Sequence, residues 1–174
     1  MSQRTRLKYS PLPVDTPPPN VSDFLVKGAP RFDFWEWFAG SAGLSKQMGR
    51  MKIGNRSAVV GPPISREYGW EISNRTHQAV LADLQRLRQP RILMTSPNCG
   101  PWSSSNTNMT PEVLEEVRRW ESSALEFSRE SCLKQADRGD DFILGQPRAS
   151  ELLCQPVMMF DGVPGYVPDQ CTAS

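Results

Sequence analysis

Residues 91–106 read Arg-Ile-Leu-Met-Thr-Ser-Pro-Asn-Cys-Gly-Pro-Trp-Ser-Ser-Ser-Asn, and this stretch decides how we interpret the rest of the chain. Ile92 to Thr95 predict a short buried strand, which runs into a loop rich in turn-forming residues. The loop presents one cysteine, Cys99, between two prolines. In α/β proteins ligands bind beyond the carboxyl ends of the strands, so a thiol at this position is a candidate for chemistry. The alternative is that Cys99 is simply a small buried residue, since free cysteine is among the most buried residue types.

The composition bounds the classes of function. The chain has 174 residues, which fits one domain with its own hydrophobic core. With 20 Lys and Arg against 19 Asp and Glu, the net charge is +1, so bulk electrostatic attraction to nucleic acid or to an anionic membrane is excluded. The four cysteines form no C-x-x-C pair, which argues against a zinc ribbon, and no metal is expected. Because neither a signal peptide nor a long apolar run is found, we expect free thiols, an intracellular location and no membrane partner.

Proline and apolar residues divide the chain into three regions. Residues 1–30 are rich in proline and poor in apolar side chains, so we predict a disordered leader that cannot offset the entropy of ordering. Residues 31–150 alternate apolar segments with helical patterns and are predicted to form the folded domain. Residues 151–174 are rich in turn formers, and we predict a weakly structured segment.

The alternation between residues 31 and 150 indicates an α/β fold with a mostly parallel sheet. Continuous apolar runs predict strands over 32–38, 57–61, 92–95 and 141–145. Two helices are expected, one between a cap at Ser73 or Asn74 and a stop at Pro90, the other between a cap at Thr110 and a stop at Gly139. The only histidine, His77, is expected to face solvent in the first turn of the first helix.

A turn of small residues, Ala39 to Ser45, follows the first predicted strand. A strand, a glycine-rich turn and a helix in this order let backbone N–H groups approach a nucleotide-like ligand closely. Glycines also simply make turns, but their position directly after a buried strand favours a ligand site.

Several motifs in this order resemble those of DNA cytosine-C5 methyltransferases. Residues 36–44, Glu-Trp-Phe-Ala-Gly-Ser-Ala-Gly-Leu, resemble the first motif, in which a strand-to-helix turn holds S-adenosylmethionine. Residues 96–103, Ser-Pro-Asn-Cys-Gly-Pro-Trp-Ser, resemble the nucleophile loop. Residues 69–72 look like the element that meets the cofactor adenine, and residues 142–147 fall where the family has a strand ending in a glutamate. Residues 169–171 are loosely similar to divergent copies in retrotransposon polyproteins.

The resemblance implies an incomplete Rossmann-like, S-adenosylmethionine-dependent methyltransferase fold and a mechanism. In the family, a thiolate attacks C6 of a flipped-out cytosine, and C5 then takes the methyl group. Cys99 matches the nucleophile. DNA is implied as a partner, contacted through a recognition region that the resemblance does not cover, with a nuclear location if the chain is active on DNA. The positions that match the cofactor site are Phe38, Ala39, Gly40, Ser41, Gly43, Leu44, Glu71 and Pro97.

The departures from the family pattern are as informative as the matches. Gly145 stands where the family glutamate holds the cytosine ring, and losing one such contact costs about 10² to 10³ in rate. Asn98 replaces a proline and is expected to loosen the nucleophile loop, and Ala42 replaces a glycine. The likeness covers about residues 32–150. We therefore expect weak or lost activity. The alternatives are a noncatalytic remnant of a mobile-element polyprotein and a methyltransferase that acts on something other than DNA.

Overall fold

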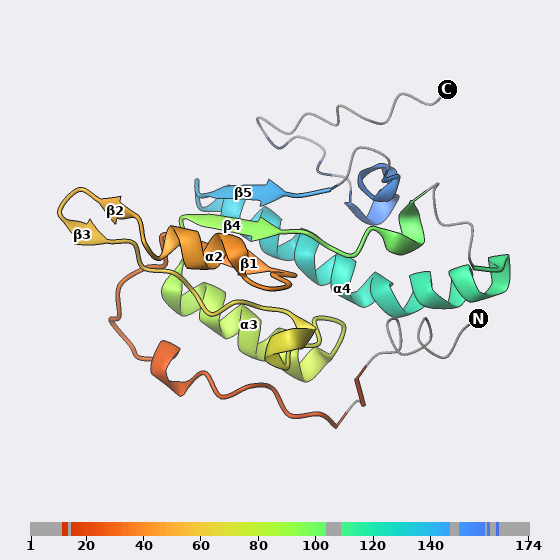
Figure 1. Cartoon of the computed structure of the whole chain (residues 1–174), viewed down its shortest axis with the longest axis horizontal. Coiled ribbons are helices and arrows are strands. Elements are labelled where there is room, and N and C mark those ends of the chain that lie inside the picture. Colours follow the sequence, from red (N-terminus) through yellow and green to blue (C-terminus); the bar gives the residue numbers. More distant parts are fainter. Residues whose placement is uncertain are drawn as a thin grey trace.

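The fold is α/β and is built on a parallel sheet of three strands in the order β1-β4-β5 (Figure 1). The strands are β1 (Phe34–Trp37), β4 (Ile92–Thr95) and β5 (Asp141–Leu144). Their register sets Phe34 opposite Ile92, and Ile92 opposite Asp141. This arrangement confirms the predicted α/β class and the mostly parallel sheet.

The structure is a computed structural model that describes residues 12–13, 15–103, 109–146, 150–158, 160 and 163. Four of the segments discussed above lie wholly or partly outside the described residues. They are residues 1–11 of the predicted leader, residues 104–106 after the cysteine loop, residue 147 of the strand-end motif and residues 169–171.

The strand predicted at 57–61 is only partly formed. Residues 58–64 run parallel to β1 but make two isolated bridges, Phe34 to Val60 and Trp37 to Ile64. Pro62 and Pro63 lie between these bridges and lack the N–H groups that a regular ladder needs. The start of the predicted strand instead belongs to a short antiparallel hairpin of β2 (Lys52–Ile53) and β3 (Arg56–Ser57), which the sequence did not indicate.

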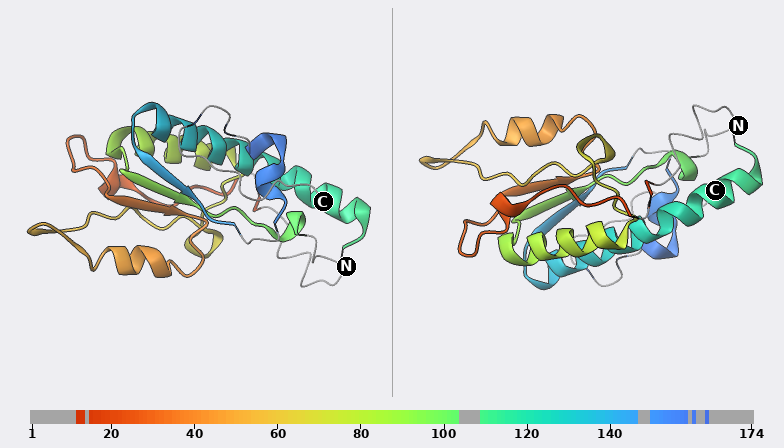
Figure 2. Two further views of the ribbon diagram at one scale, coloured as in Figure 1. Left: turned by 90° about the horizontal axis from the view of Figure 1, so that it is seen from above. Right: turned by 90° about the horizontal axis from the view of Figure 1, so that it is seen from below.

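Helices cover both faces of the sheet. The short helix α2 (Gly43–Met48) lies on one face, and α3 (Arg75–Arg88) and α4 (Pro111–Asp137) lie on the other (Figure 2). The Asn74 side chain caps α3 by accepting from the N–H of Thr76, and the Thr110 side chain caps α4 by accepting from the N–H of Val113. The two long helices therefore begin at the residues that the sequence predicted.

The core lies between the sheet and the layer formed by α3 and α4. Trp37 of β1 stacks on Phe127 of α4, with ring centroids 5.4 Å apart. Gly61 lies so close to the Trp35 ring that an added Cβ would overlap it, so glycine is required there by packing. The largest fully buried side chains are Trp35, Trp37, Phe32, Phe160, Ile64, Leu81, Leu84, Leu93, Leu125, Leu152, Met158 and His77.

Part of the predicted leader lies against this core. Residues 22–24 form a short 3-10 helix, η1 (Ser22–Phe24), and the preceding Val21 is buried. The Arg88 guanidinium lies 4.2 Å from the centroid of the Phe32 ring, and its Nε donates to the carbonyl oxygen of Pro30. Residues 15–30 are therefore part of the fold, although the sequence placed them in a disordered leader.

The described residues after β5 also contribute to the core. The 3-10 helices η4 (Leu152–Cys154) and η5 (Pro156–Met158) bring Leu152 and Met158 into it, and Phe160 stacks on Phe142 with centroids 5.2 Å apart. Short apolar contacts of this kind have no periodic sequence signature, which is why the segment was predicted to be weakly structured. Cys154 is disulfide-bonded, against the expectation of free thiols.

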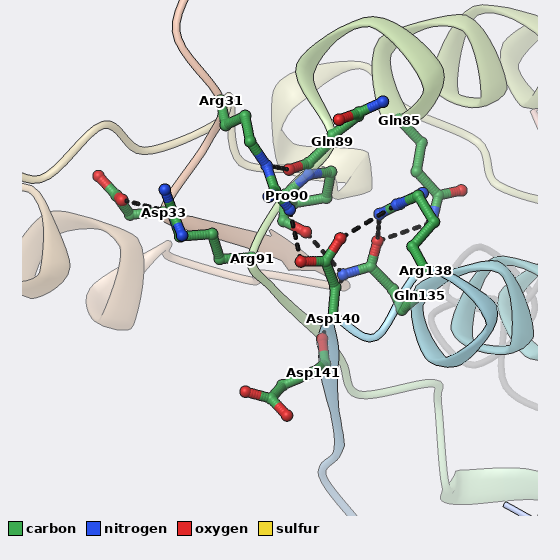
Figure 3. Close-up of polar contacts among 10 residues, drawn as sticks. All are labelled: Arg31, Asp33, Gln85, Gln89, Pro90, Arg91, Gln135, Arg138, Asp140 and Asp141. Carbon is green, nitrogen blue, oxygen red and sulfur yellow. Dashed lines mark hydrogen bonds and ion pairs between the residues drawn. The ribbon is translucent and has the colours of Figure 1, made fainter.

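A polar network closes the end of the sheet where β4 and β5 begin (Figure 3). Gln135 of α4 donates to the carbonyl oxygens of Pro90 and Asp141 at 2.8 and 3.1 Å. Arg31 pairs with Asp140 at the same end. These contacts fix the amino ends of the strands, and the loops at the carboxyl ends remain for a ligand site.

Candidate functional site

The loops after β1 and β4 meet at one pocket. Because β1 and β4 are adjacent and parallel, with Trp37 opposite Thr95, both loops leave the sheet at the same edge. A pocket of about 300 Å³ is lined by Phe38 and Gly40 from the first loop and by Ser96 and Asn98 from the second. The glycine-rich turn and the cysteine loop, far apart in the sequence, therefore face a common cavity.

The turn after β1 has an unusual backbone. Phe38, Gly40 and Ala42 have φ values of 57°, 49° and 56°, in the left-handed region that favours glycine. This conformation is costly for a bulky residue such as Phe38, and such strain is found mainly where a site requires it. Glu36 of β1 holds the far end of the turn, because its Oε2 accepts hydrogen bonds from the N–H and the hydroxyl of Ser45 at 2.8 and 2.6 Å.

Open space lies beside the two glycines of this turn. A Cβ added at Gly40 or Gly43 would meet no atom within 4 Å. Gly40 needs its positive φ, but Gly43 has no such requirement. No contact within the described protein requires glycine at Gly43, so the residue fits a turn that a ligand approaches closely.

Glu71 is a buried carboxylate on the wall of the pocket, with 5% of its surface exposed. Its Oε2 pairs with Arg66 at 2.8 Å and accepts from the N–H of Leu12 at 3.1 Å, and its Oε1 accepts from the Ser73 hydroxyl at 2.8 Å. Both oxygens are thus engaged. A ligand hydroxyl that binds Glu71 must share an oxygen or displace the Leu12 amide.

His77 is placed differently from the prediction. It is 0% exposed, and its Nδ1 accepts from the N–H of Glu71 at 3.0 Å while its Nε2 lies 2.9 Å from the carbonyl oxygen of Thr16. The expectation of a solvent-facing histidine is wrong, because the ring turns back from the start of α3 to fix the segment that carries Glu71. No neighbouring residue pattern indicated this contact.

Two further glutamates face the pocket with opposite pKa shifts. The hydrogen bond from Ser65 is the largest of the effects that lower the pKa of Glu67. Burial raises the pKa of Glu121, and Glu71 raises it further, while Arg66 and a hydrogen bond with Asn98 act in the opposite direction.

Glu121 was not among the residues predicted from the sequence, although a signal existed. The buried face of α4 includes Val117, Ala124, Ser128, Ser131 and Gln135. Glu121 falls at the helical spacing of this face, between Val117 and Ala124. A carboxylate at a core-facing position is uncommon without a partner or a function.

The cysteine loop is held by contacts from several elements. Asn98 Oδ1 accepts from the N–H of Gly100 at 3.1 Å, and Arg118 of α4 donates to the carbonyl oxygen of Pro101 at 3.0 Å. Gln146, after β5, donates to the carbonyl oxygen of Pro97 at 2.8 Å. The loss of a proline at Asn98 was expected to loosen this loop, but the asparagine side chain supplies a local hydrogen bond in its place.

The two free cysteines of the described chain differ in accessibility. Cys99 is half-buried and directly follows the pocket-lining Asn98, at the start of the 3-10 helix η3 (Gly100–Trp102). Cys132 is fully buried in α4, and burial raises the pKa of its thiol to about 12. Because the thiolate is the nucleophile, Cys99 is the candidate for covalent chemistry and Cys132 is not.

The residues matched to the cofactor site are partly brought together. Phe38, Gly40 and Glu71 line the pocket. The other matched positions lie in the same two loops or at the start of α2 but do not form the wall of the pocket: Ala39 and Pro97 are buried, Leu44 is half-buried, and Ser41 and Gly43 are exposed.

Gly145 lies at the end of β5, beside the cysteine loop. An added Cβ would overlap the Ser96 hydroxyl and lie 3.3 Å from the Met94 methyl group. Gly145 therefore lies next to the cysteine loop, and the Ser96 hydroxyl occupies the space that a side chain at position 145 would need.

Comparisons of the chain with protein-family models, curated proteins and solved structures found no match. Among the described residues, no group of three or more His, Cys, Asp or Glu side chains could hold a metal ion. In the same part of the chain, no helix is both long and apolar enough to cross a membrane.

Proposed function

We propose that this chain is a Rossmann-like domain that binds S-adenosylmethionine and acts, weakly, as a DNA cytosine-C5 methyltransferase with Cys99 as its nucleophile. One observation carries the proposal: the glycine-rich turn after β1 and the cysteine loop after β4 line the same pocket. This is the arrangement that methyl transfer needs, because the methyl donor and the attacked base must meet between the two loops.

The charge of the pocket supports a cationic cofactor. Its wall carries Glu67, Glu71 and Glu121 but only Arg66 as a cation. Excess carboxylate repels the phosphates of a dinucleotide or a nucleoside triphosphate and attracts a ligand with positive groups. S-adenosylmethionine carries an ammonium, a sulfonium and a carboxylate group, so its net charge is +1, and it has no phosphate.

When bound, S-adenosylmethionine would supply an electrophilic methyl group. The Cys99 thiolate would add to C6 of the cytosine, and C5 would take the methyl group, with S-adenosylhomocysteine as the leaving group. A solvent base would then take the proton from C5, the bond between sulfur and C6 would break, and its electron pair would return to sulfur as the thiolate. With glycine at position 145, the described loops offer no carboxyl group there to hold the ring, so the rate is expected to be low.

A noncatalytic cofactor-binding remnant, of the kind carried in mobile-element polyproteins, is the second candidate. Two observations favour it: Gly145 lacks the acid, and the Leu12 amide occupies an oxygen of Glu71. If the chain is active, DNA is its partner and a compartment that holds DNA, such as a nucleus, is its place of action.

Calorimetric titration with S-adenosylmethionine tests cofactor binding, with ATP as a phosphate-bearing control. We expect a measurable heat of binding with S-adenosylmethionine and none with ATP. Glu71→Gln should weaken binding about tenfold, while the exposed Glu126→Gln on α4 should not. An equal response to both ligands, or none to either, contradicts the assignment.

Trapping on DNA that contains 5-fluorocytosine tests catalysis. A covalent adduct is expected for the wild-type chain with cofactor and should be absent in Cys99→Ala. If the protein binds S-adenosylmethionine in calorimetry but forms no covalent adduct, the noncatalytic cofactor-binding function is supported instead.

A further inference from the structure

Glu121 links the ligand pocket to the cysteine loop. It lies on α4, lines the pocket, and shares a hydrogen bond with Asn98. Asn98 Oδ1 accepts from the N–H of Gly100. The hydrogen bond with Asn98 lowers the pKa of Glu121, and an ionised carboxylate can only accept, so the Asn98 amide nitrogen is the donor to Glu121. One asparagine side chain therefore joins a pocket carboxyl group to the backbone next to Cys99.

The charges around Glu121 make this link sensitive to the ligand. Arg66 and Glu71, from the segment before α3, change the pKa of Glu121 through their charges, Arg118 lies one turn earlier on α4, and Glu67 lines the same pocket. Burial and Glu71 both oppose the charged form of Glu121. A positive group in the pocket offsets both effects and favours the carboxylate.

The charged form holds the loop more firmly than the neutral form. A hydrogen bond to an ionised acceptor is about twice as strong as one between neutral groups. The hydrogen bond between the Glu121 carboxylate and the Asn98 amide is therefore stronger when a cation lies in the pocket. Asn98 in turn accepts a hydrogen bond from the N–H of Gly100.

We propose that Glu121 is a positioning residue that, through Asn98, fixes the Cys99 loop when a cationic ligand occupies the pocket. This inference rests on the proposed function for the identity of that ligand. By linkage, a firmly held loop also increases the affinity for the cation, so ligand binding and ordering of the nucleophile are coupled.

Hydrogen exchange of the full chain, followed in peptides that cover residues 96–103, tests the coupling. S-adenosylmethionine, with a net charge of +1, and its thioether product S-adenosylhomocysteine, a zwitterion without the sulfonium charge, serve as the charged and net-neutral probes. In the wild-type protein, the charged probe should slow exchange of the loop more than the neutral one does. In Glu121→Gln, the loop should exchange about fivefold faster without ligand, and the difference between the two probes should vanish.

Glu126→Gln, an exposed change on the same helix, should behave as the wild type. Asn98→Ala, which also removes the acceptor of the Gly100 N–H, should speed exchange of the loop at least as much as Glu121→Gln and likewise abolish the difference between the probes. Thermal unfolding of each variant shows whether it is folded. If Glu121→Gln matches the wild type in loop exchange, the link is refuted. A protein that binds neither probe would defeat the proposed function, while the ligand-free comparison still decides whether Glu121 holds the loop.

Discussion

Gln146, just after β5, donates a hydrogen bond of 2.8 Å from its Nε2 to the carbonyl oxygen of Pro97 in the cysteine loop. Its Oε1 accepts in turn from the hydroxyl of Ser150 at 3.1 Å, and Ser150 forms a bridge with Ser103 at the other end of the loop. The Gln146 side chain thus ties the end of the third strand to both ends of the segment that carries Cys99.

Gln146→Ala should loosen this segment without unfolding the protein. The substitution removes both hydrogen bonds of the side chain, and each contributes about 1 kcal/mol to the free energy of unfolding. We expect faster hydrogen exchange in residues 96–103 and a small fall in the urea midpoint. Gln47→Ala, on the exposed side of α2, is the matched control and should change neither. Equal loop exchange in both variants would show that Gln146 does not hold the loop.

Gly145→Glu restores the acid of the family pattern, but the structure predicts a steric cost. The new Cβ would overlap the Ser96 hydroxyl, and overpacking of this kind costs about 1 to 3 kcal/mol. The double variant Gly145→Glu, Ser96→Ala should recover most of this stability and trap more 5-fluorocytosine DNA than the wild type. If the double variant is stable and binds S-adenosylmethionine but forms no more adduct, another defect limits the reaction.

Gly43→Ala tests whether glycine is needed at this position for ligand binding or for folding. The added Cβ meets no protein atom, and alanine is a better helix former than glycine, so stability should rise by about 0.5 to 1 kcal/mol. Affinity for S-adenosylmethionine should fall about tenfold if the ligand approaches this turn. Gly49→Ala, at the other end of α2, should leave the affinity unchanged. Unchanged binding in Gly43→Ala would show that the ligand does not approach this turn.

Alkylation should distinguish the two free cysteines. Because burial raises the pKa of the Cys132 thiol to about 12, iodoacetamide at pH 8 should label Cys99 and leave Cys132 unmodified in the native protein. Peptide mass spectrometry gives the two extents, and both residues should react in denaturant. Native labelling of Cys132 at the rate of Cys99 would mean that α4 opens readily.

Asp33 should contribute stability that depends on pH. The hydrogen bond from Arg56 is the largest of the effects that hold the pKa of Asp33 below its usual range, and the N–H of Val59 and the charge of Arg91 add to it. Because its pKa is lower in the folded state, the contribution is complete above about pH 4 and is lost as the pH falls through the folded value.

Asp33→Asn should therefore lower the free energy of unfolding by about 1 kcal/mol at pH 7, and by progressively less below pH 4. Urea titrations across this range measure the difference. Asp23→Asn in η1, which is exposed, is the control. A deficit for Asp33→Asn that stays constant with pH would show that packing, not charge, explains it.

Short-range patterns in the sequence predicted most of the strands and the two long helices. The apolar runs that became β1, β4 and β5 and the caps at Asn74 and Thr110 are short-range features, so they could be found in the sequence. The partial strand beside β1 shows the limit of such runs, because Pro62 and Pro63 prevent the regular pairing that the apolar pattern predicts.

The candidate site was predictable only where its residues lie in the short motifs that the sequence singled out. Phe38, Gly40 and Glu71 reach the pocket as the matched motifs implied. Glu121 and Arg66 reach it from other elements, and His77 acts on Glu71 through a backbone N–H. Contacts of this kind depend on how the elements pack, and no window of sequence contains both partners.

The direct pairing of β1 with β4 determines which insertions and shifts in the chain would preserve the geometry of the pocket. Neighbouring strands lie about 4.8 Å apart, so the sheet itself sets the separation of the turn after β1 from the cysteine loop. A longer or shorter α3 would alter the crossover outside the sheet and leave that separation intact. A slip of one residue in the pairing of Trp37 with Thr95 would move the thiol about 3.3 Å along the strand and exchange the faces of every side chain in β4. Insertions in the connecting helix are therefore tolerable, and slips in strand register are not.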